Sequence, residues 1–259
     1  MNFRDFLNDH KICDAHIHLA DCYDSGVKLI MSRNYSCISC SHSRKEFDLQ
    51  AEFIQRILPD SKPFIVSSFG IHPQNPDLAN IDYLQELLNS DKIGAIGETG
   101  FDFFTPEFKA HAGVQEEAFI IQTEFAQKYN KPLVLHGRKC LESFFKYKKN
   151  LTKVPAVVFH SFMGTPLDAV SFLKSGINGY FSFSAQIIKG NKKAVSCVKE
   201  LALERLLLET DAPYQTLKGE SLTPCERIFE VYDEAFKIRG ESDFERFTEQ
   251  LYSNFMSLF

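Results

Sequence analysis

Short apolar runs alternate with stretches of helical spacing along this chain, and this alternation is the feature that most restricts its fold. Eight runs are predicted strands, at 12–19, 36–42, 64–73, 95–102, 132–137, 156–162, 179–184 and 206–213. The predicted helices include 45–57, 80–90, 107–129, 165–175 and 191–203, followed by 224–239 and 242–258. Such alternation predicts an α/β protein, either a (β/α)₈ TIM barrel or a doubly wound sheet.

The length of the chain agrees with a barrel. Its 259 residues would fit two average domains, but α/β barrels reach this size as one domain. No internal repeat, low-complexity tract or linker divides the sequence. We therefore expect residues 1–259 to form a single barrel domain.

Ionisable side chains gather at the carboxyl ends of the predicted strands, whose bodies are apolar. They are His16 and His18 on the first strand, His72 on the third, Glu98 on the fourth, His136 on the fifth, His160 on the sixth and Asp211 on the eighth. Catalytic groups of a barrel converge on its axis from the carboxyl ends of many strands, whereas those of an open sheet cluster at one crevice. This distribution favours the barrel.

Imidazole and carboxylate groups brought together in this way need a partner, because burying unpaired charges is costly. Without His72, the four other histidines and the two carboxylates exceed what one tetrahedral ion needs and suit a site for two divalent ions. One ion is expected on His16, His18 and Asp211, and the other on His136 and His160, with Glu98 as the bridge. Zinc and manganese suit imidazole better than magnesium does, and the choice among the three is left open.

Two further carboxylates lie one layer deeper on the same strand faces. In "ICDAHIHL", Asp14 alternates with His16 and His18 and so shares their face, and Glu209 lies in the same way below Asp211. Asp14 and Glu209 are therefore predicted to orient the ligands rather than to bind metal.

The charge of the chain bears on its substrate. The net charge is −5 and the sequence pI is about 5.9, so the protein as a whole does not attract nucleic acid. Two divalent ions with two carboxylates would leave the site near +2, and this favours an anionic ligand such as a phosphodiester. Any polyanion would thus be held by the ions and by local cations.

Cysteine usage and the first residues bear on location. The seven cysteines are mostly in apolar runs and are expected to be buried free thiols. The single C-x-x-C of Cys37 and Cys40 is interpreted as part of a core strand, with a redox or metal role as the alternative. The start of the chain lacks signal-peptide features, and no apolar run approaches a membrane span. These features predict a cytoplasmic protein with no membrane partner.

The motifs together resemble the TatD family of metal-dependent deoxyribonucleases, in the amidohydrolase-like barrel superfamily. The similar segments are, in order, "DAHIHL", "GIHP", "GETGFDFF", "PLVLHGR", "VVFHSFMG" and "LLLETDAPY". The resemblance implies a barrel with one or two divalent ions that hydrolyses DNA, typically from the 3′ end. It also implies the metal ligands already named, and phosphate contacts by His72 and Arg138. No organic cofactor is expected, and the oligomeric state is open.

Several roles are then predicted. Asp211 is expected to take the proton of the attacking water and is catalytic together with the bridging Glu98. Lys189 follows the seventh strand, near a helix start, and is a candidate phosphate contact beside Arg138. Three aromatic residues after the fourth strand are candidates for stacking on bases or for the core, namely Phe101, Phe103 and Phe104.

Two rival functions stay open. After "ETDAPY" the family often has a basic stretch, but here "QTLKGESLTPCE" has only Lys218 as a positive residue. This difference favours a related hydrolase of a small ester, lactone, amide or phosphoester. A barrel that only binds a partner is the other rival, but the ligand set is complete and argues against it.

Overall fold

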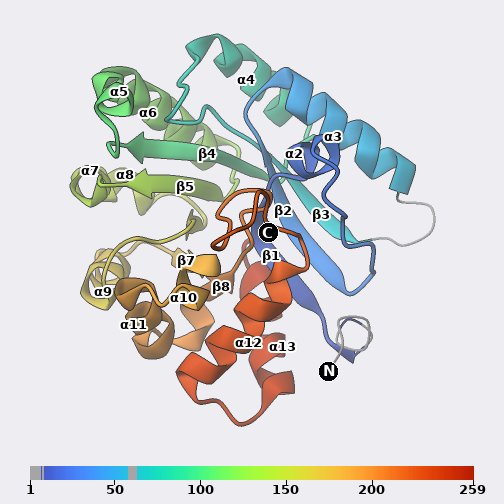
Figure 1. Ribbon diagram of the computed structural model, residues 1–259. Helices are drawn as coiled ribbons and strands as arrows, with labels where there is room; N and C mark the ends of the chain where they lie inside the picture. Colours follow the sequence, from blue (N-terminus) through green and yellow to red (C-terminus); the bar gives the residue numbers. More distant parts are fainter. Residues whose placement is uncertain (1–6, 8, 58–62) are drawn as a thin grey trace.

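The structure, a computed structural model, describes residues 7, 9–57 and 63–259, and within them eight parallel strands form one sheet in sequence order (Figure 1). The strands are β1 (Ile12–Ile17), β2 (Tyr35–Ser41), β3 (Phe64–Phe69), β4 (Ala95–Asp102), β5 (Leu133–Arg138), β6 (Val157–Phe159), β7 (Gly179–Phe183) and β8 (Leu206–Leu208). Two backbone hydrogen bonds join the segment after β8 to the end of β1. The Asp211 N–H donates to the His16 carbonyl (3.0 Å), and the His18 N–H donates to the Ala212 carbonyl (2.9 Å). The sheet thus curves round on itself, and the predicted (β/α)₈ barrel is confirmed over the open sheet.

Helices surround the strands (Figure 1). They are α2 (Leu19–Asp24), α3 (Arg44–Ile57), α4 (Ile81–Asn89), α5 (Pro106–Ala110), α6 (Ala112–Lys128), α7 (Leu141–Lys146), α8 (Lys148–Leu151), α9 (Pro166–Lys174), α10 (Ala185–Ile188), α11 (Lys192–Glu200), α12 (Arg227–Arg239) and α13 (Phe244–Met256), with 3₁₀ turns η1 (Leu78–Asn80) and η2 (Leu203–Arg205). In the part of the chain that the structure describes, no helix combines the length and apolar character that crossing a membrane requires.

The prediction of one helix at 107–129 was wrong, because the chain breaks at His111 into α5 and α6. The buried side chain of Gln115 explains the break. Its Nε2 donates to the Phe108 carbonyl (2.8 Å), and its Oε1 accepts from the Asp102 N–H (3.0 Å). A side chain therefore satisfies part of the end of α5 and ties it to the end of β4.

Several strands end earlier than the sequence pattern predicts. β3, β6 and β8 end at Phe69, Phe159 and Leu208, so His72, His160 and Asp211 lie in the loops beyond them. β1 ends at Ile17, and His18 directly precedes α2. These four side chains therefore lie beyond the strand ends, which frees them from the strict alternation of a strand, whereas His16, Glu98 and His136 lie within β1, β4 and β5.

Aromatic packing between the sheet and its outer helices holds the barrel in shape. Phe159 of β6 stacks on Phe181 of β7 (ring centroids 5.1 Å apart) and on Phe172 of α9 (4.8 Å). Phe101 of β4 is buried against Phe119 of α6, with ring centroids 4.9 Å apart. All seven cysteines are buried and free, as predicted, and Cys37 and Cys40 belong to the core of β2.

Candidate metal centre

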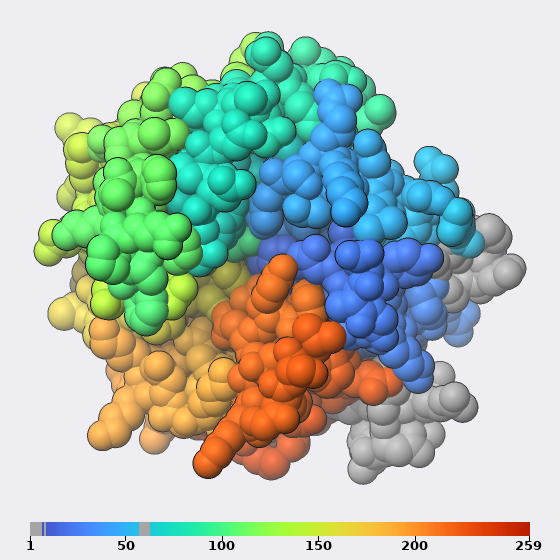
Figure 2. Space-filling model, turned by 45° about the horizontal axis from the view of Figure 1, so that its top comes forward, coloured from blue at the N-terminus to red at the C-terminus, as the bar shows by residue number. Residues whose placement is uncertain are grey.

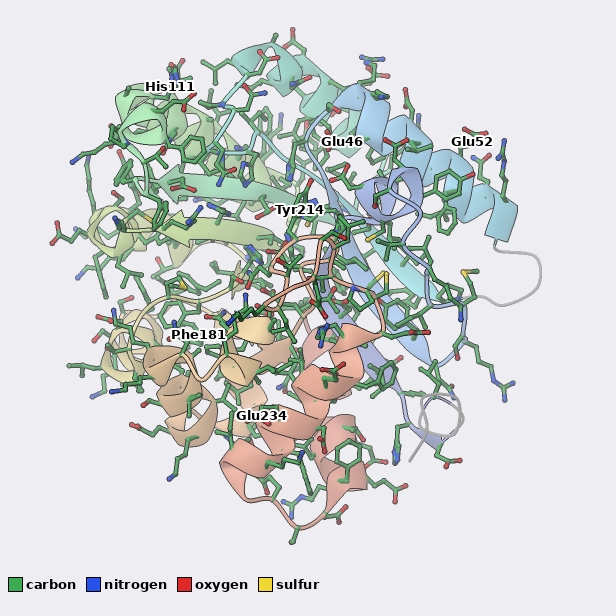
Figure 3. All side chains as sticks on the ribbon, in the orientation of Figure 1. Glu46, Glu52, His111, Phe181, Tyr214 and Glu234 are labelled. Atoms are coloured by element: carbon green, nitrogen blue, oxygen red, sulfur yellow. The ribbon has the colours of Figure 1, made fainter. Side chains whose placement is uncertain are left out.

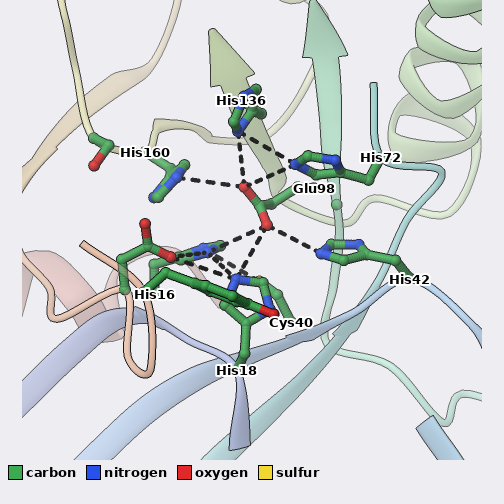
Figure 4. Close-up of polar contacts among 12 residues, drawn as sticks. His16, His18, Cys40, His42, His72, Glu98, His136 and His160 are labelled. Carbon is green, nitrogen blue, oxygen red and sulfur yellow. Dashed lines mark hydrogen bonds and ion pairs between the residues drawn. The ribbon is translucent and has the colours of Figure 1, made fainter. Parts of the chain in front are cut away.

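Imidazole and carboxylate groups from most of the strands meet at one end of the barrel (Figure 4). In the described part of the chain, four groups of three residues could each hold a metal ion, because the three ligand atoms within a group lie within 4.8 Å of one another. They are His16–His18–Asp211, His16–Glu98–His160, His18–His42–Glu98 and His72–Glu98–His136. The first group has the composition predicted for one ion. Both His136 and His160 face Glu98, but they belong to different groups.

Glu98 is the centre of the cluster, and each of its carboxylate oxygens faces three imidazole nitrogens (Figure 4). Around Oε2 lie the Nε2 atoms of His42 (3.1 Å), His16 (3.3 Å) and His18 (3.4 Å). Around Oε1 lie Nδ1 of His136 (3.2 Å) and the Nε2 atoms of His160 (3.4 Å) and His72 (3.7 Å). A carboxylate in this position can bridge two ions, one on each oxygen.

Two glycines allow Glu98 to reach this position. Gly97 and Gly100 have φ values of +135° and +140°, which side chains rarely adopt. A Cβ atom at Gly97 would meet the Val134 carbonyl oxygen of β5, and one at Gly100 would meet that of His136. The glycines of "GETG" are therefore needed for the close approach of β4 to β5.

Asp211 completes the side of the cluster next to β1. Its Oδ1 lies 3.5 Å from Nε2 of His16 and 3.4 Å from Nε2 of His18, and these two Nε2 atoms are 3.1 Å apart. Ligands of a tetrahedral ion with bonds of about 2.05 Å are roughly 3.3 Å apart. The spacings of this donor set therefore fit a divalent ion bound among the three side chains.

Two imidazoles of the cluster are oriented by a carboxylate that contacts the ring nitrogen opposite Glu98. Nε2 of His136 lies 3.1 Å from Asp102 Oδ2, so its Nδ1 points to Glu98. Nδ1 of His160 lies 3.0 Å from Glu209 Oε1, so its Nε2 points to Glu98. Such contacts are typical of metal-binding histidines, because they select the tautomer and hold the ring. The orienting role predicted for Glu209 is thus consistent with its contact to His160.

Asp14 accepts hydrogen bonds from backbone N–H groups and hydroxyl groups rather than from an imidazole. Its carboxylate accepts hydrogen bonds from the Thr210 N–H (2.9 Å), the Thr210 hydroxyl (2.7 Å) and the His16 N–H (3.3 Å). Nδ1 of His16 instead lies 3.3 Å from the thiol of Cys40. Asp14 therefore holds β1 against the segment that carries Asp211, and so affects the positions of both candidate ligands, His16 and Asp211, indirectly.

The electrostatics of the cluster keep its carboxylates ionised. Burial favours the neutral form of Glu98, but the imidazoles around it, His16 and His160 first, hold its pKa well below the usual value. In the same way, His160 and His18 outweigh burial and lower the pKa of Asp211 to about 2.

The imidazoles of the cluster are shifted in both directions. Burial disfavours a charged His160, but Glu209, Glu98 and Asp211 raise its pKa to about 10. Burial lowers the pKa of His72 well below its usual value. A cluster in which ionised carboxylates face some neutral and some protonated imidazoles is prepared to exchange protons for metal cations.

A cavity of about 620 Å³ opens over the cluster. Its lining residues are His18, Asp21, His42, Glu46, His72, Gln74, Glu98, His136, Gly137, Arg138, His160, Ser161, Met163, Gln186, Asn191, Asp211, Tyr214 and Gln215. Figure 3 shows Tyr214 near the middle of the barrel, whereas His111 and Glu234 lie at its periphery. In Figure 2 the orange segment after β8 lies beside the blue segment after β1, where the Tyr214 hydroxyl donates to Asp21 (3.0 Å).

The structure separates the two predicted cationic contacts. Arg138 lines the cavity, with its guanidinium 3.6 Å from Asp102 and 3.9 Å from the ring centre of Phe104. Lys189 lies outside the lining, and its ammonium contacts the Gln215 carbonyl (3.4 Å). Of the three aromatic candidates, Phe101 is buried in the core and Phe104 is exposed.

Three residues of the site were missed by sequence reasoning. His42 ends the predicted strand 36–42 with a polar side chain, and the rule applied to the other strands would have found it. Asp102 belongs to the segment "GETGFDFF", but nothing in that segment indicates that its carboxylate contacts His136. Gln215 gave no signal, although its Nε2 donates to Asp211 Oδ2 (2.9 Å) and contacts the Ser161 hydroxyl.

Comparisons with known proteins agree with this architecture. A family model described as "TatD related DNase" matches residues 13–259. The "Uncharacterized metal-dependent hydrolase YabD" of Bacillus subtilis is 29% identical over 214 residues, which are 78% of this chain and 80% of that protein. The "3'-5' ssDNA/RNA exonuclease TatD" of Pantoea ananatis is 33% identical over 176 residues, or 64% of this chain and 65% of that protein.

Among solved structures, YJJV, described as a TATD homolog from Escherichia coli, superposes with a TM-score of 0.79. It is 22% identical in sequence, and the superposition covers 96% of this chain and 98% of that one. This likeness extends the agreement in fold over almost the whole chain.

Proposed function

This chain belongs to the TatD-related DNase family of metal-dependent hydrolases, and from that premise we propose that it removes nucleotides from the 3′ ends of single-stranded DNA with two divalent ions. The proposal for the substrate is supported by the relative from Pantoea ananatis, whose name describes a 3'-5' ssDNA/RNA exonuclease. The imidazole and carboxylate groups gathered at the carboxyl end of the barrel support the proposal of metal-dependent hydrolysis.

One observation carries the proposal of two ions. Each oxygen of Glu98 faces three imidazole nitrogens at 3.1–3.7 Å, so a single carboxylate has a separate set of donors on either side. We propose His16, His18, Asp211 and Glu98 for one ion, and Glu98, His136 and His160 for the other. His42 and His72 are further donors of the same cluster. A set so rich in imidazole favours zinc or manganese over magnesium.

The residues of the cavity would have different roles in hydrolysis. When bound, the ions would polarise the phosphoryl oxygens and lower the pKa of the attacking water. Asp211 remains ionised, with Oδ1 facing the cluster, and is placed to accept the proton of that water. Arg138 is held by Asp102 and Phe104, and its exposed guanidinium can bind a phosphate oxygen. His72 and Lys189 stay predicted phosphate contacts, with Lys189 outside the cavity lining.

The test of this function is nucleotide release from a labelled single-stranded oligonucleotide. Metal-stripped protein is assayed alone and after addition of Mn²⁺, Zn²⁺ or Mg²⁺, with the label placed at the 3′ or the 5′ end in parallel. We expect release only with an added ion, with mononucleotides appearing first from the 3′-labelled substrate. If protein shown to bind metal releases nothing under any of these conditions, the exonuclease proposal is wrong.

Metal loading is expected to depend on pH in a defined direction. In the metal-free protein the pKa of His160 is about 10, and that of His18 and of His136 is also raised, so these imidazoles hold protons that a bound ion must displace. The metal-free form therefore binds more protons than the loaded form, and metal affinity should rise as the pH rises toward about 10.

Calorimetric titration of metal-stripped protein checks this expectation. Carried out in two buffers with different ionisation enthalpies, it should report proton release on binding, with an affinity that is greater at pH 8 than at pH 6.5. An affinity that does not change with pH, with equal heats in both buffers, would show that the imidazoles are neutral before metal arrives.

Hydrolysis of a small ester or phosphoester is the second candidate function. Its support is the position of Lys189 outside the cavity lining, together with the single positive residue, Lys218, in the segment 215–226. Parallel assays with p-nitrophenyl phosphate, bis-p-nitrophenyl phosphate and simple lactones separate the two functions, because an exonuclease should prefer the oligonucleotide by orders of magnitude. The cytoplasmic location and the single domain over residues 1–259 stay predictions.

A further inference from the structure

The cavity over the candidate metal ligands has two walls, which differ in the charge of their side chains. The segments that follow β2 to β5 contribute mainly charged or titratable side chains, namely His42, Glu46, His72 and Arg138, together with the amide of Gln74. The segments that follow β6 to β8 contribute, besides the cluster residues His160 and Asp211, only uncharged side chains among the described residues. These are Ser161, Met163, Gln186, Asn191, Tyr214 and Gln215. A ligand with an anionic part and a neutral part would place the neutral part against this second wall.

Gln186 in the neutral wall has a carboxamide without a partner. The residue is 7% exposed, and neither its Nε2 nor its Oε1 has a hydrogen-bond partner in the part of the chain that the structure describes. Gln115 and Gln122 use both amide atoms, on backbone groups of α5 and β4 and on those of Ile71, and the buried Gln50 is bonded through Oε1 alone. A buried amide that lacks both bonds destabilises the fold and calls for an explanation.

The backbone fixes the position of this carboxamide. Gln186 lies in α10, directly after β7, between Ala185 and Ile187, which are both buried in the core. Its carbonyl accepts a hydrogen bond from the Asn191 N–H (3.0 Å), so the segment after α10 is tied to it as well. Gln186 lines the same cavity as Glu98, His160 and Asp211 of the candidate metal site. The amide is thus held at the site without a structural function in the described residues.

We propose that Gln186 binds the base of the nucleotide whose phosphate lies at the metal cluster. This inference rests on the proposed function. An amide presents a donor and an acceptor side by side, and each of the four bases has an edge that presents the complementary pair. The exposed side chains of Met163 and Tyr214 in the same wall offer apolar surface for the face of the base. Because all four bases qualify, the contact selects a nucleotide that carries a base over one that lacks it.

The test compares two oligonucleotides that differ only at the 3′-terminal nucleotide, which carries either a base or a tetrahydrofuran in its place. The variant is Gln186→Met, which keeps the length of the side chain and removes both polar atoms. Loss of a paired hydrogen-bond contact should lower kcat/KM for the base-bearing substrate by about tenfold. The value for the tetrahydrofuran substrate should stay unchanged, and the melting temperature should not fall.

A conservative variant of Gln186 and a control at another glutamine complete this test. Gln186→Asn keeps the amide but shortens its reach, and it should retain part of the preference. Gln127→Met is the matched control, because Gln127 bonds to the Asn150 carbonyl (2.9 Å) and lies outside the cavity lining. It should leave the preference between the two substrates unchanged.

The possible failures are distinguishable. An equal loss on both substrates with a lower melting temperature would assign Gln186 a structural role and overturn the inference. An unchanged preference in Gln186→Met would overturn it as well, and in both cases the proposed exonuclease function would stand. Absence of nucleotide release by the parent protein from either substrate would overturn the proposed function and this inference together.

Discussion

Replacement of Glu98 by alanine is expected to lower the rate of phosphodiester hydrolysis by about 10³-fold or more, because ions at such sites supply several kcal/mol of transition-state stabilisation. Both oxygens of this carboxylate face imidazole nitrogens, so its removal takes a ligand from each proposed ion at once. The six imidazoles around Glu98 would also lose the negative charge that they share. The loss of activity should therefore be accompanied by a loss of bound metal.

Metal content separates this explanation from a simple loss of folding. The parent protein, loaded and then dialysed, should retain two ions per chain by elemental mass spectrometry, and Glu98→Ala should retain fewer. Added Mn²⁺ or Zn²⁺ should raise the melting temperature of the parent much more than that of the variant. Glu98→Gln serves as a second variant that preserves the shape of the side chain.

Glu107→Ala is a suitable control, since Glu107 is an exposed acidic residue of α5, a few residues beyond the same strand. Its activity and metal content should match those of the parent. If Glu98→Ala kept two ions and most of the activity, Glu98 would not be the bridge, and the proposed partition of ligands would have to be abandoned.

Replacement of Asp211 by asparagine is expected to lower kcat by about 10²–10⁴-fold while metal binding largely persists. Asparagine keeps an oxygen that can face His16 and His18, which remain as ligands with Glu98. It cannot accept a proton as the aspartate does, whose pKa of about 2 keeps it ionised. The effect should therefore fall on kcat more than on KM, and more on turnover than on metal content.

Kinetics and metal content measured on the same preparation decide this prediction. The exposed Asp24 of α2 provides the control Asp24→Asn, which should behave like the parent. A proportional loss of metal and activity in Asp211→Asn would assign Asp211 to metal binding alone. Activity close to that of the parent would mean that another group takes the proton, and the acceptor would have to be sought elsewhere in the cavity.

The fold could be predicted to a large extent, because it rests on local patterns. Eight apolar runs with helical stretches between them predict the barrel. Local signals also mark helix starts, since Thr105 and Thr165 are each followed by proline and a helix begins directly after each of them. Both hydroxyls cap their helices, accepting from the N–H groups of Phe108 (3.2 Å) and Asp168 (3.3 Å). The break at His111 escaped prediction because it depends on the contacts of the Gln115 side chain with Asp102 and Phe108, which the periodicity of apolar residues does not report.

The candidate site could be predicted as a set of residues but not as an arrangement. Carboxyl ends of parallel strands lie at one end of a barrel, so polar residues at those ends had to meet. Their pairing depends on positions that no motif specifies. Asp211 and Gln215 both adopt left-handed backbone conformations, with φ of 55° and 54°, and this turn directs Nε2 of Gln215 onto Asp211.

The sequence by itself determined the barrel class, the identity of most cluster residues and the end of the barrel where they gather, because these follow from strand alternation and chain order. Only the tertiary structure decided which atoms face one another. Asp14 holds Thr210, 196 residues away, and Glu98 collects imidazoles from five other segments. The physical reason is that such contacts depend on the closure of the sheet and on side-chain packing, which place atoms within hydrogen-bonding distance irrespective of their separation along the chain.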